Sequence, residues 1–111
     1  METLDFDEND IRNHCAPSMR ILMHVRESTI EKKVTQYAQT QGWLSFKWVS
    51  PSQRGVPDRL FFREGAVVMV EFKAPGRRPT AYQEAIHRRL KDQGFEVHIV
   101  DDVELGKALL H

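Results

Sequence analysis

Two carboxylates and a lysine stand at a spacing that could hold a metal ion beside a reacting group: Asp58, Glu71 and Lys73. They flank two apolar runs separated by Glu64-Gly65, a pair typical of the two-residue turn of a β-hairpin. A turn at that pair places Asp58 opposite Glu71, on a shared face with Cβ atoms about 4.5–5.5 Å apart. Lys73 lies two residues beyond Glu71 and projects from the same face. Because facing carboxylates repel each other, the pattern predicts a divalent cation between them.

The segments around these residues resemble the Pro-Asp…Glu-x-Lys signature of the PD-(D/E)xK nucleases. In detail they resemble the virus-type replication-repair nuclease (VRR-NUC) domain of the stand-alone phage and bacterial type. The matching pieces are Gly55-Val56-Pro57-Asp58, Glu71-Phe72-Lys73 and Gln83, with Glu31 as the glutamate of an upstream helix. The resemblance covers about residues 26–102. The chain departs from the family at Ile86, three residues after Gln83, where an aromatic residue is frequent.

The resemblance implies a restriction-endonuclease-like fold that hydrolyses phosphodiester bonds with Mg²⁺ or Mn²⁺. Mg²⁺ prefers oxygen ligands and keeps several waters. The implied ligands are Asp58, Glu71, the carbonyl group of Phe72, and Glu31. The metal polarises the phosphoryl oxygen and acidifies a bound water. Lys73 would orient that water or offset charge in the transition state, and Gln83 would position Lys73 or the phosphate. The expected catalytic set is Asp58, Glu71, Lys73, Glu31 and Gln83.

Two members of this set also have an explanation confined to their own helices. Ser28-Thr29-Ile30-Glu31 has the form of a capping box, in which Glu31 serves only the helix backbone. The segment from Thr80 to Gln83 repeats the pattern. The predicted buried stripe of the first helix is Ile30, Val34, Tyr37 and Ala38. Glu31 lies beside this stripe and could also reach the sheet, so both interpretations stay open.

Periodicity and chain breakers predict the elements that must position the site. They are a helix over 28–41, an aromatic-rich strand Trp43–Val49, the two hairpin strands, a helix over 80–93, a strand Phe95–Val100 and a short last helix capped at Asp101-Asp102. The last strand follows a helix, so it should pair in parallel through a right-handed crossover. Both faces of the hairpin are apolar, so helices should cover both. The predicted fold class is α/β, a small mixed sheet of about four strands flanked by helices.

The composition is that of one small globular domain, with 111 residues of which 41% are hydrophobic and 29% are charged. Residues 1–25 are predicted to form an acidic tail and an arm, and residues 26–111 the nuclease domain. The chain has 16 basic and 16 acidic residues, but five of the acids lie within residues 1–10, which leaves 16 against 11 beyond them. That balance is a modest signal for a polyanion such as DNA. Charge alone favours a solvated surface with an acidic tail.

Five arginines are expected to contact DNA phosphates: Arg54, Arg77, Arg78, Arg88 and Arg89. Arg54, like Gln53, belongs to the loop before Asp58, for which a plain polar loop is an equally good interpretation. The other four surround the basic loop after Lys73 and the outer side of the next helix. The five histidines have no metal-ligand spacing and are interpreted as structural or solvated.

The sequence is interpreted as a metal-dependent, structure-specific DNA endonuclease of the cytoplasm. A single cysteine, no signal-peptide pattern and no apolar run near the roughly 18 residues of a membrane span support that location. Resemblance to stand-alone family members implies a homodimeric Holliday-junction resolvase acting on branched DNA, because a two-fold dimer can present one site to each of two strands. The apolar segment Met19–Val25 is a candidate interface, or a flap on its own subunit.

Two other functions stay open. Within enzymes, the alternative is a flap or nicking endonuclease with a different substrate geometry. Outside enzymes, the alternative is a fold that binds branched DNA without cutting it. The intact set of Asp58, Glu71 and Lys73 argues against a protein that only binds.

Overall fold

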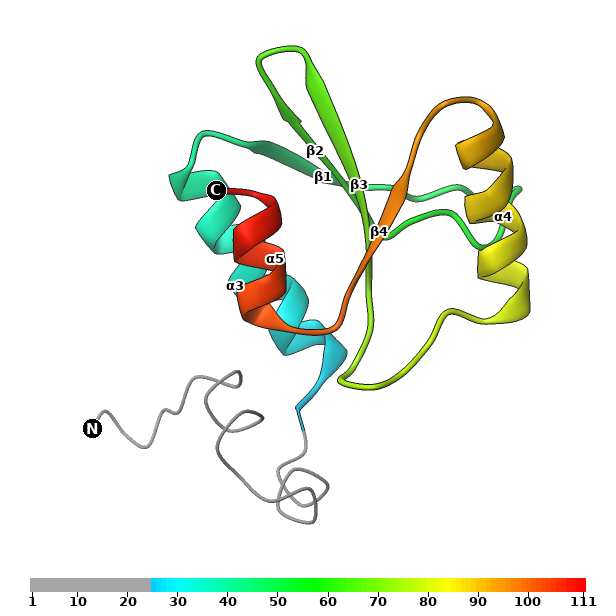
Figure 1. Cartoon of the computed structure of the whole chain (residues 1–111), viewed down its shortest axis with the longest axis horizontal. Helices are drawn as coiled ribbons and strands as arrows, with labels where there is room; N and C mark the ends of the chain where they lie inside the picture. Colours follow the sequence, from blue (N-terminus) through cyan, green and yellow to red (C-terminus); the bar gives the residue numbers. More distant parts are fainter. Residues whose placement is uncertain (1–24) are drawn as a thin grey trace.

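The computed structural model describes residues 25–111, which form one mixed sheet and three helices (Figure 1). In chain order the elements are α3 (Glu27–Thr40), β1 (Leu44–Lys47), β2 (Arg59–Arg63), β3 (Ala66–Phe72), α4 (Ala81–Asp92), β4 (Val97–Val100) and α5 (Val103–Leu109). The predicted α/β class with a four-stranded mixed sheet is confirmed. Within the described part of the chain, no helix is long and apolar enough to cross a membrane.

The strands lie in the order β1-β2-β3-β4, with β4 parallel to β3 and the other neighbours antiparallel. The predicted hairpin is confirmed, with Arg63 opposite Ala66 across the turn Glu64-Gly65. Both turn residues have positive φ angles, 50° and 84°, as a type I′ turn requires, and that turn matches the twist of the flanking strands. Pairing ends at Arg59 and Val70. Asp58 lies one residue before β2, where the same register continues toward Glu71.

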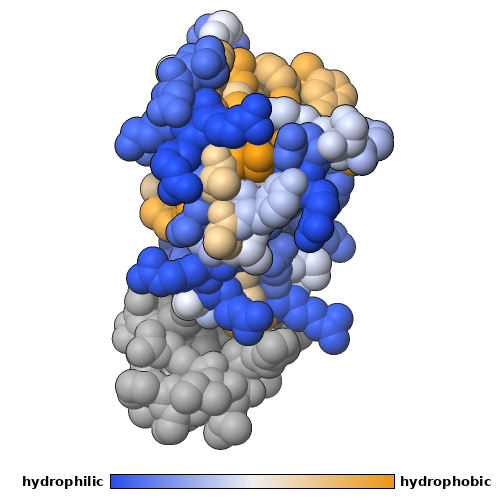
Figure 2. All heavy atoms as spheres, turned by 90° about the vertical axis from the view of Figure 1, so that its right-hand side faces the viewer, coloured by the Kyte–Doolittle hydropathy of each residue, from blue (hydrophilic) through white to orange (hydrophobic). Residues whose placement is uncertain are grey.

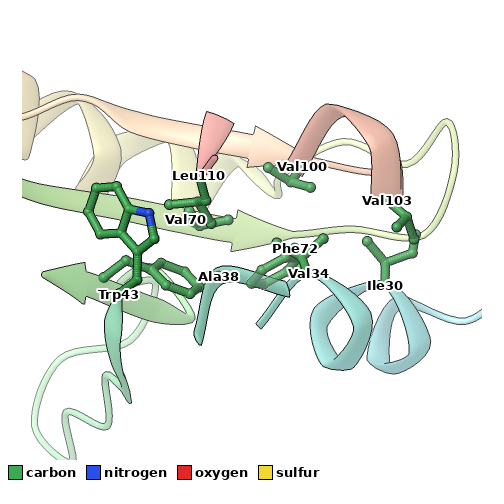
Figure 3. Packing of buried hydrophobic residues seen from close by; sticks show 10 residues of the cluster. Ile30, Val34, Ala38, Trp43, Val70, Phe72, Val100, Val103 and Leu110 are labelled. Atoms are coloured by element: carbon green, nitrogen blue, oxygen red, sulfur yellow. The ribbon is translucent and has the colours of Figure 1, made fainter. Parts of the chain in front are cut away.

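The helices divide between the two faces of the sheet, with α3 and α5 on one face and α4 on the other (Figure 1). The buried core lies on the α3–α5 side and consists of Ile30, Val34, Ala38, Trp43, Phe61, Val70, Phe72, Val100, Val103 and Leu110 (Figure 3). At Gly106 of α5 an added Cβ would come within 2.5 Å of Val34. Glycine at this position therefore lets α5 approach α3 closely enough to close the core.

The start of α3 differs from the prediction. Its N-cap is Arg26, with no side-chain cap, and the carbonyl of Arg26 accepts hydrogen bonds from the N–H groups of Thr29 and Ile30. The predicted capping box from Ser28 to Glu31 is therefore wrong, because Ser28 already lies inside the first turn. Val25, just before the helix, packs against the core. This packing favours a helix that begins before Ser28, earlier than the local polar pattern indicates. The second predicted capping box, at Thr80 and Gln83, is confirmed.

The coverage of the sheet also differs from the prediction. On the α4 side, Leu44, Phe46 and Val67 keep 56%, 55% and 44% of their surface exposed. The α4 helix packs on β4, at the far edge of the sheet from β1. The α4 helix has 12 residues and does not cover the β1–β2 part of this face. The prediction that helices cover both faces is therefore wrong for this part of the sheet.

Smaller differences concern boundaries. The first strand is limited to Leu44–Lys47 and the last to Val97–Val100, both shorter than predicted. In α3 the buried positions include Thr35, whereas Tyr37 of the predicted stripe is only half-buried. The acidic tail, and the arm of residues 1–25 apart from Val25, lie outside the described residues. Residues 19–24 of the candidate interface Met19–Val25 lie outside them, and Val25 packs against the core.

Candidate active site

Asp58, Glu71 and Lys73 meet where β3 ends. This is the end of the sheet near which α3 and α4 begin (Figure 1). Glu71 is 1% exposed, and Nζ of Lys73 lies 3.4 Å from its Oε2. Asp58 reaches the same place from the loop before β2, and its Oδ2 accepts a hydrogen bond of 2.7 Å from the backbone N–H of Phe72. The backbone N–H of Lys73 donates to the carbonyl of Val100 (3.0 Å), which continues the β3–β4 pairing beyond the strand. The strand end therefore holds the lysine in place.

Gln83 joins the acid and the base of this group. Its Nε2 donates to Oε2 of Glu71 over 2.9 Å, and its Oε1 accepts from Nζ of Lys73, also over 2.9 Å. The orientation of the amide follows, because a carboxylate only accepts and an ammonium group only donates. The same Oε1 accepts from the backbone N–H of Thr80, whose hydroxyl oxygen accepts from the N–H of Gln83. Gln83 therefore caps α4 and contacts the site at once, so its two sequence interpretations are compatible.

Electrostatic strain marks both carboxylates. Burial, and next the charge of Asp58, raise the pKa of Glu71 to about 7, while Lys73 acts in the opposite direction. Burial also raises the pKa of Asp58; the hydrogen bond from Phe72 counteracts this, and the charge of Glu31 adds to it. Two acids that have lost water and lie near each other favour protons, or another cation, over the doubly ionised state.

Glu71 presents an unused oxygen in this environment. Its Oε1 is buried and has no hydrogen-bond partner among the described residues. Nε2 of His87 lies 3.8 Å away, and it is also buried and without a hydrogen-bond partner in the described part of the chain. Buried carboxylate oxygens are normally satisfied. An orphaned oxygen in the site therefore indicates a partner other than residues 25–111, and a bound cation is one such partner.

His87 lies beside the site, although the spacing of the histidines in the sequence did not identify it as a site residue. Burial, followed by the charge of Lys73, lowers its pKa. His87 lies one helical turn after Gln83 on α4, so both side chains project from the same helical face. That spacing of four was the signal in the sequence. His87 is thus buried beside the site, which is compatible with the structural alternative of the prediction that each histidine is structural or solvated.

Two glutamates of α3, Glu31 and Glu27, interact electrostatically with the site. Oε2 of Glu31 lies 2.7 Å from Nε of Arg59 and 3.2 Å from Nζ of Lys47, so two cations engage it. Glu27 lies one turn earlier on α3. Burial, and then the charge of Asp58, raise the pKa of Glu27. Glu27 in turn contributes to the raised pKa of Glu71. The spacing of four between Glu27 and Glu31 was the available signal.

The predicted DNA-binding arginines fall into three places. Arg77, Arg78 and Arg88 line a cavity of about 650 Å³ together with Lys91. His87 also lines it, so this cavity adjoins Glu71. Three acids share the cavity: Glu84, Glu96 and Asp101. Arg89 lines a different cavity beside Trp48, and the guanidinium of Arg54 lies 5.1 Å from the ring centre of Tyr82.

The fit of a metal ion can be judged from these groups. Among residues 25–111, no three His, Cys, Asp or Glu side chains are grouped as a complete metal site. Mg²⁺ in phosphoryl-transfer sites typically takes only one or two carboxylates and fills its remaining positions with water and substrate. Asp58 and Glu71 supply two carboxylates, and both have raised pKa values, mainly because they are buried. Oε1 of Glu71 has no hydrogen-bond partner among the described residues. The residues present therefore fit a hydrated divalent cation.

Comparisons with known proteins agree with this geometry. No model of a known protein family matches the chain. Over 86 residues the chain is 42% identical to a protein of Acyrthosiphon pisum secondary endosymbiont phage 1 named "Putative nuclease p44", and the match covers 77% of this chain and 92% of that protein. A solved structure described as "VRR_NUC domain" has a TM-score of 0.69 to this chain at 25% sequence identity, and it covers 75% of this chain and 91% of its own. Sequence and fold are thus each similar over most of both chains.

Proposed function

The chain belongs to the VRR-NUC nuclease family, and from this premise we propose that it is a divalent-metal-dependent DNA endonuclease. The observation that carries the proposal is the hydrogen-bonded group in which Gln83 links Glu71 to Lys73 beside Asp58. Such a group combines two acids for a metal with a cation held at a fixed position. That combination suits the hydrolysis of a phosphodiester, in which negative charge must be stabilised on non-bridging and leaving oxygens.

The proposed metal is Mg²⁺, or Mn²⁺, and its ligands are Asp58, Glu71 and the carbonyl group of Phe72. When bound, the metal supplies a Lewis acid for the phosphoryl oxygen and lowers the pKa of a water molecule. Asp58 reaches the site with one oxygen already oriented by the N–H of Phe72. Glu71 contributes the unpaired Oε1, while Gln83 holds its other oxygen. These contacts orient both acids before substrate arrives.

Lys73 is the proposed catalytic cation. Its ammonium group is held by Oε1 of Gln83 and lies 3.4 Å from Glu71, so it can orient the attacking water or offset charge in the transition state. Glu27, whose pKa is raised by burial and then by the charge of Asp58, would hold a water molecule at the metal site. Glu31, engaged by Arg59 and Lys47, would then order the strand beneath the site rather than bind the ion.

DNA is the proposed substrate because basic side chains gather beside the site. Arg77, Arg78 and Arg88 are exposed and line the cavity that His87 connects to Glu71. Contacts to phosphates position DNA without reading its sequence. Recognition would then rest on the shape and backbone of the DNA, which suits an enzyme that acts on branched structures.

A homodimer that resolves four-way junctions is the proposed assembly. Its support is the open apolar part of the sheet at Leu44, Phe46 and Val67, since exposed apolar surface of this kind marks interaction sites. In the view that faces α4, one group of hydrophobic side chains lies at the upper end, and others lie among hydrophilic side chains lower down (Figure 2). We assign this surface to a second copy, because a two-fold dimer presents two sites to the two-fold symmetric junction.

The test is the cleavage of four-way, flap and linear DNA, each with Mg²⁺ and with a chelator. Wild-type protein should cut only with the metal and should prefer the four-way junction. Asp58→Asn should lose cleavage yet keep its fold and DNA binding, because it removes one of two mutually repelling charges. Cleavage by Asp58→Asn at the wild-type rate would refute the site. Preference for the flap DNA would favour a flap or nicking endonuclease, and binding without cleavage would favour the non-catalytic alternative.

A further inference from the structure

A second cavity, of about 440 Å³, is lined by residues on the opposite side of α4 from those that line the arginine-rich one. Its apolar walls are Trp48, Val56, Ile86 and Leu90. Its polar groups include Gln53 and Arg89. The volume lies within the ~300–1,000 Å³ typical of small-ligand sites. Mainly apolar walls with a few polar groups are also typical of such sites.

The cavity is tied to the catalytic residues through the backbone. The N–H of Trp48 donates to the carbonyl of Asp58 over 3.0 Å, and Val56 precedes Asp58 by two residues. On the other side, Ile86 and Leu90 belong to α4, the helix that carries Gln83. The connection between β1 and β2 runs across to α4 (Figure 1), and its residues Gln53 and Val56 line the cavity. A ligand in the cavity would therefore contact the same loop and the same helix that carry Asp58 and Gln83.

The loop that forms one wall is held firmly on α4. Gly55 has a φ of 87°, and a Cβ there would come within 3.0 Å of both Ile86 and Tyr82. Only glycine permits this backbone and this close approach. The guanidinium of Arg54 lies over the ring of Tyr82 and adds a cation–π contact to the same junction. These contacts fix the loop against α4, and the cavity lies between the two.

Its chemistry matches a nucleobase. The indole of half-buried Trp48 offers a flat face on which a base can stack, and aliphatic side chains enclose the remaining walls. The amide of Gln53 can both donate to and accept from the polar edge of a base, and Arg89 can pair with the attached phosphate. A base within a duplex is already stacked and paired, so only an unpaired base could enter.

We propose that this cavity binds an unpaired nucleobase of the DNA next to the scissile phosphate, stacked on Trp48. The inference rests on the proposed function and extends it, since it assigns the preference for branched DNA to a specific site. Branch points, gaps and flaps supply unpaired bases, whereas linear duplex supplies them only after a base pair is broken. Discrimination between these substrates would then come from Trp48 in addition to the shape of the DNA.

Fluorescence can test the stacking directly. The chain has two tryptophans, and Trp43→Phe leaves Trp48 as the reporter. In this variant, a short single-stranded oligothymidine should quench the emission, and an abasic oligonucleotide with the same phosphates should not. Equal quenching by the two oligonucleotides would mean contact with the backbone alone and would overturn the proposal.

A binding experiment tests the same site without relying on catalysis or on the Trp43→Phe variant. In the Asp58→Asn background, Trp48→Leu should weaken binding to a duplex with a gap of unpaired thymidines by about tenfold or more, as expected for the loss of one stacked base. Trp48→Phe should retain most of the affinity, and none of these variants should alter binding to the same gap built from abasic residues. Val49→Ala is the matched control, because Val49 is 76% exposed and does not line the cavity.

The two proposals fail in different ways. If the protein shows base-dependent quenching but cuts no DNA, the proposed base-binding cavity is supported and the proposed endonuclease activity is refuted. Cleavage of branched DNA that is indifferent to Trp48→Leu would leave the endonuclease intact and refute the base site.

Discussion

Gln83 donates through Nε2 to Oε2 of Glu71 over 2.9 Å, across the junction between α4 and the end of β3. The same side chain completes the capping box of its own helix. A contact that stabilises the helix therefore also orients an active-site acid, and the two effects can be separated by mutation because Thr80 takes part only in the first.

Gln83→Ala should lower cleavage by about ten- to a hundredfold, the range typical of residues that orient metal ligands. It removes the contacts to both Glu71 and Lys73. Thr80→Ala is the control, because it breaks the same capping box and should cost about 1 kcal/mol of folding stability while cleavage stays nearly unchanged. Urea unfolding and initial cleavage rates measure the two quantities. An equal loss of cleavage in both variants would show that Gln83 acts through its helix alone.

The raised pKa of Glu71 predicts how the stability of the metal-free protein depends on pH. A carboxyl group with a folded pKa of about 7, against its ordinary value of 4.5, binds its proton more tightly in the native state than in the unfolded chain. Ionised Glu71 therefore destabilises the fold, fully above pH 7. As the pH falls from about 7 toward 4.5, this penalty should disappear. Urea unfolding in a chelator should show the gain in wild type and a smaller one in Glu71→Gln.

The cavity lined by Arg77 and Arg78 predicts the salt dependence of DNA binding. Each phosphate contact contributes about 0.9 to the slope of log affinity against log salt concentration. Alanine at both positions should therefore flatten the slope by nearly two units. Lys32→Ala, which removes an exposed cation from α3, should leave it unchanged. An unaltered slope in the double variant would identify these arginines as ordinary solvated surface.

The open part of the sheet predicts a variant that separates the dimer. Phe46 is 55% exposed, so Phe46→Glu should fold normally while placing a charge within the proposed interface. Sedimentation at micromolar concentration should show a dimer for wild type and a monomer for this variant. Leu105→Glu provides the comparison, because Leu105 is 50% exposed on α5, away from that face, and should remain dimeric. A wild-type monomer, or a dimer that Phe46→Glu leaves intact, would contradict the assigned interface.

Features governed by short-range rules were readable from the sequence by itself. The turn at Glu64-Gly65 and the alternation of strand residues determined the hairpin register, because a two-residue turn with positive φ leaves one way to pair the strands. The capping box of α4 likewise depends only on residues three apart, Thr80 and Gln83. The registers that bring Asp58 and Glu71 to the same strand end therefore followed from local chemistry.

Only the tertiary structure decided which partners the helical residues have. Glu27 and Glu31 occupy the same side of α3, and what separates them is Arg59, which lies 28 residues from Glu31 in sequence and engages it. His87 reaches Glu71 only because α4 packs on this side of the sheet. The open apolar face depends in the same way on where α4 ends. These outcomes are set by packing between distant segments, in which burial and long-range ion pairs outweigh the local pattern.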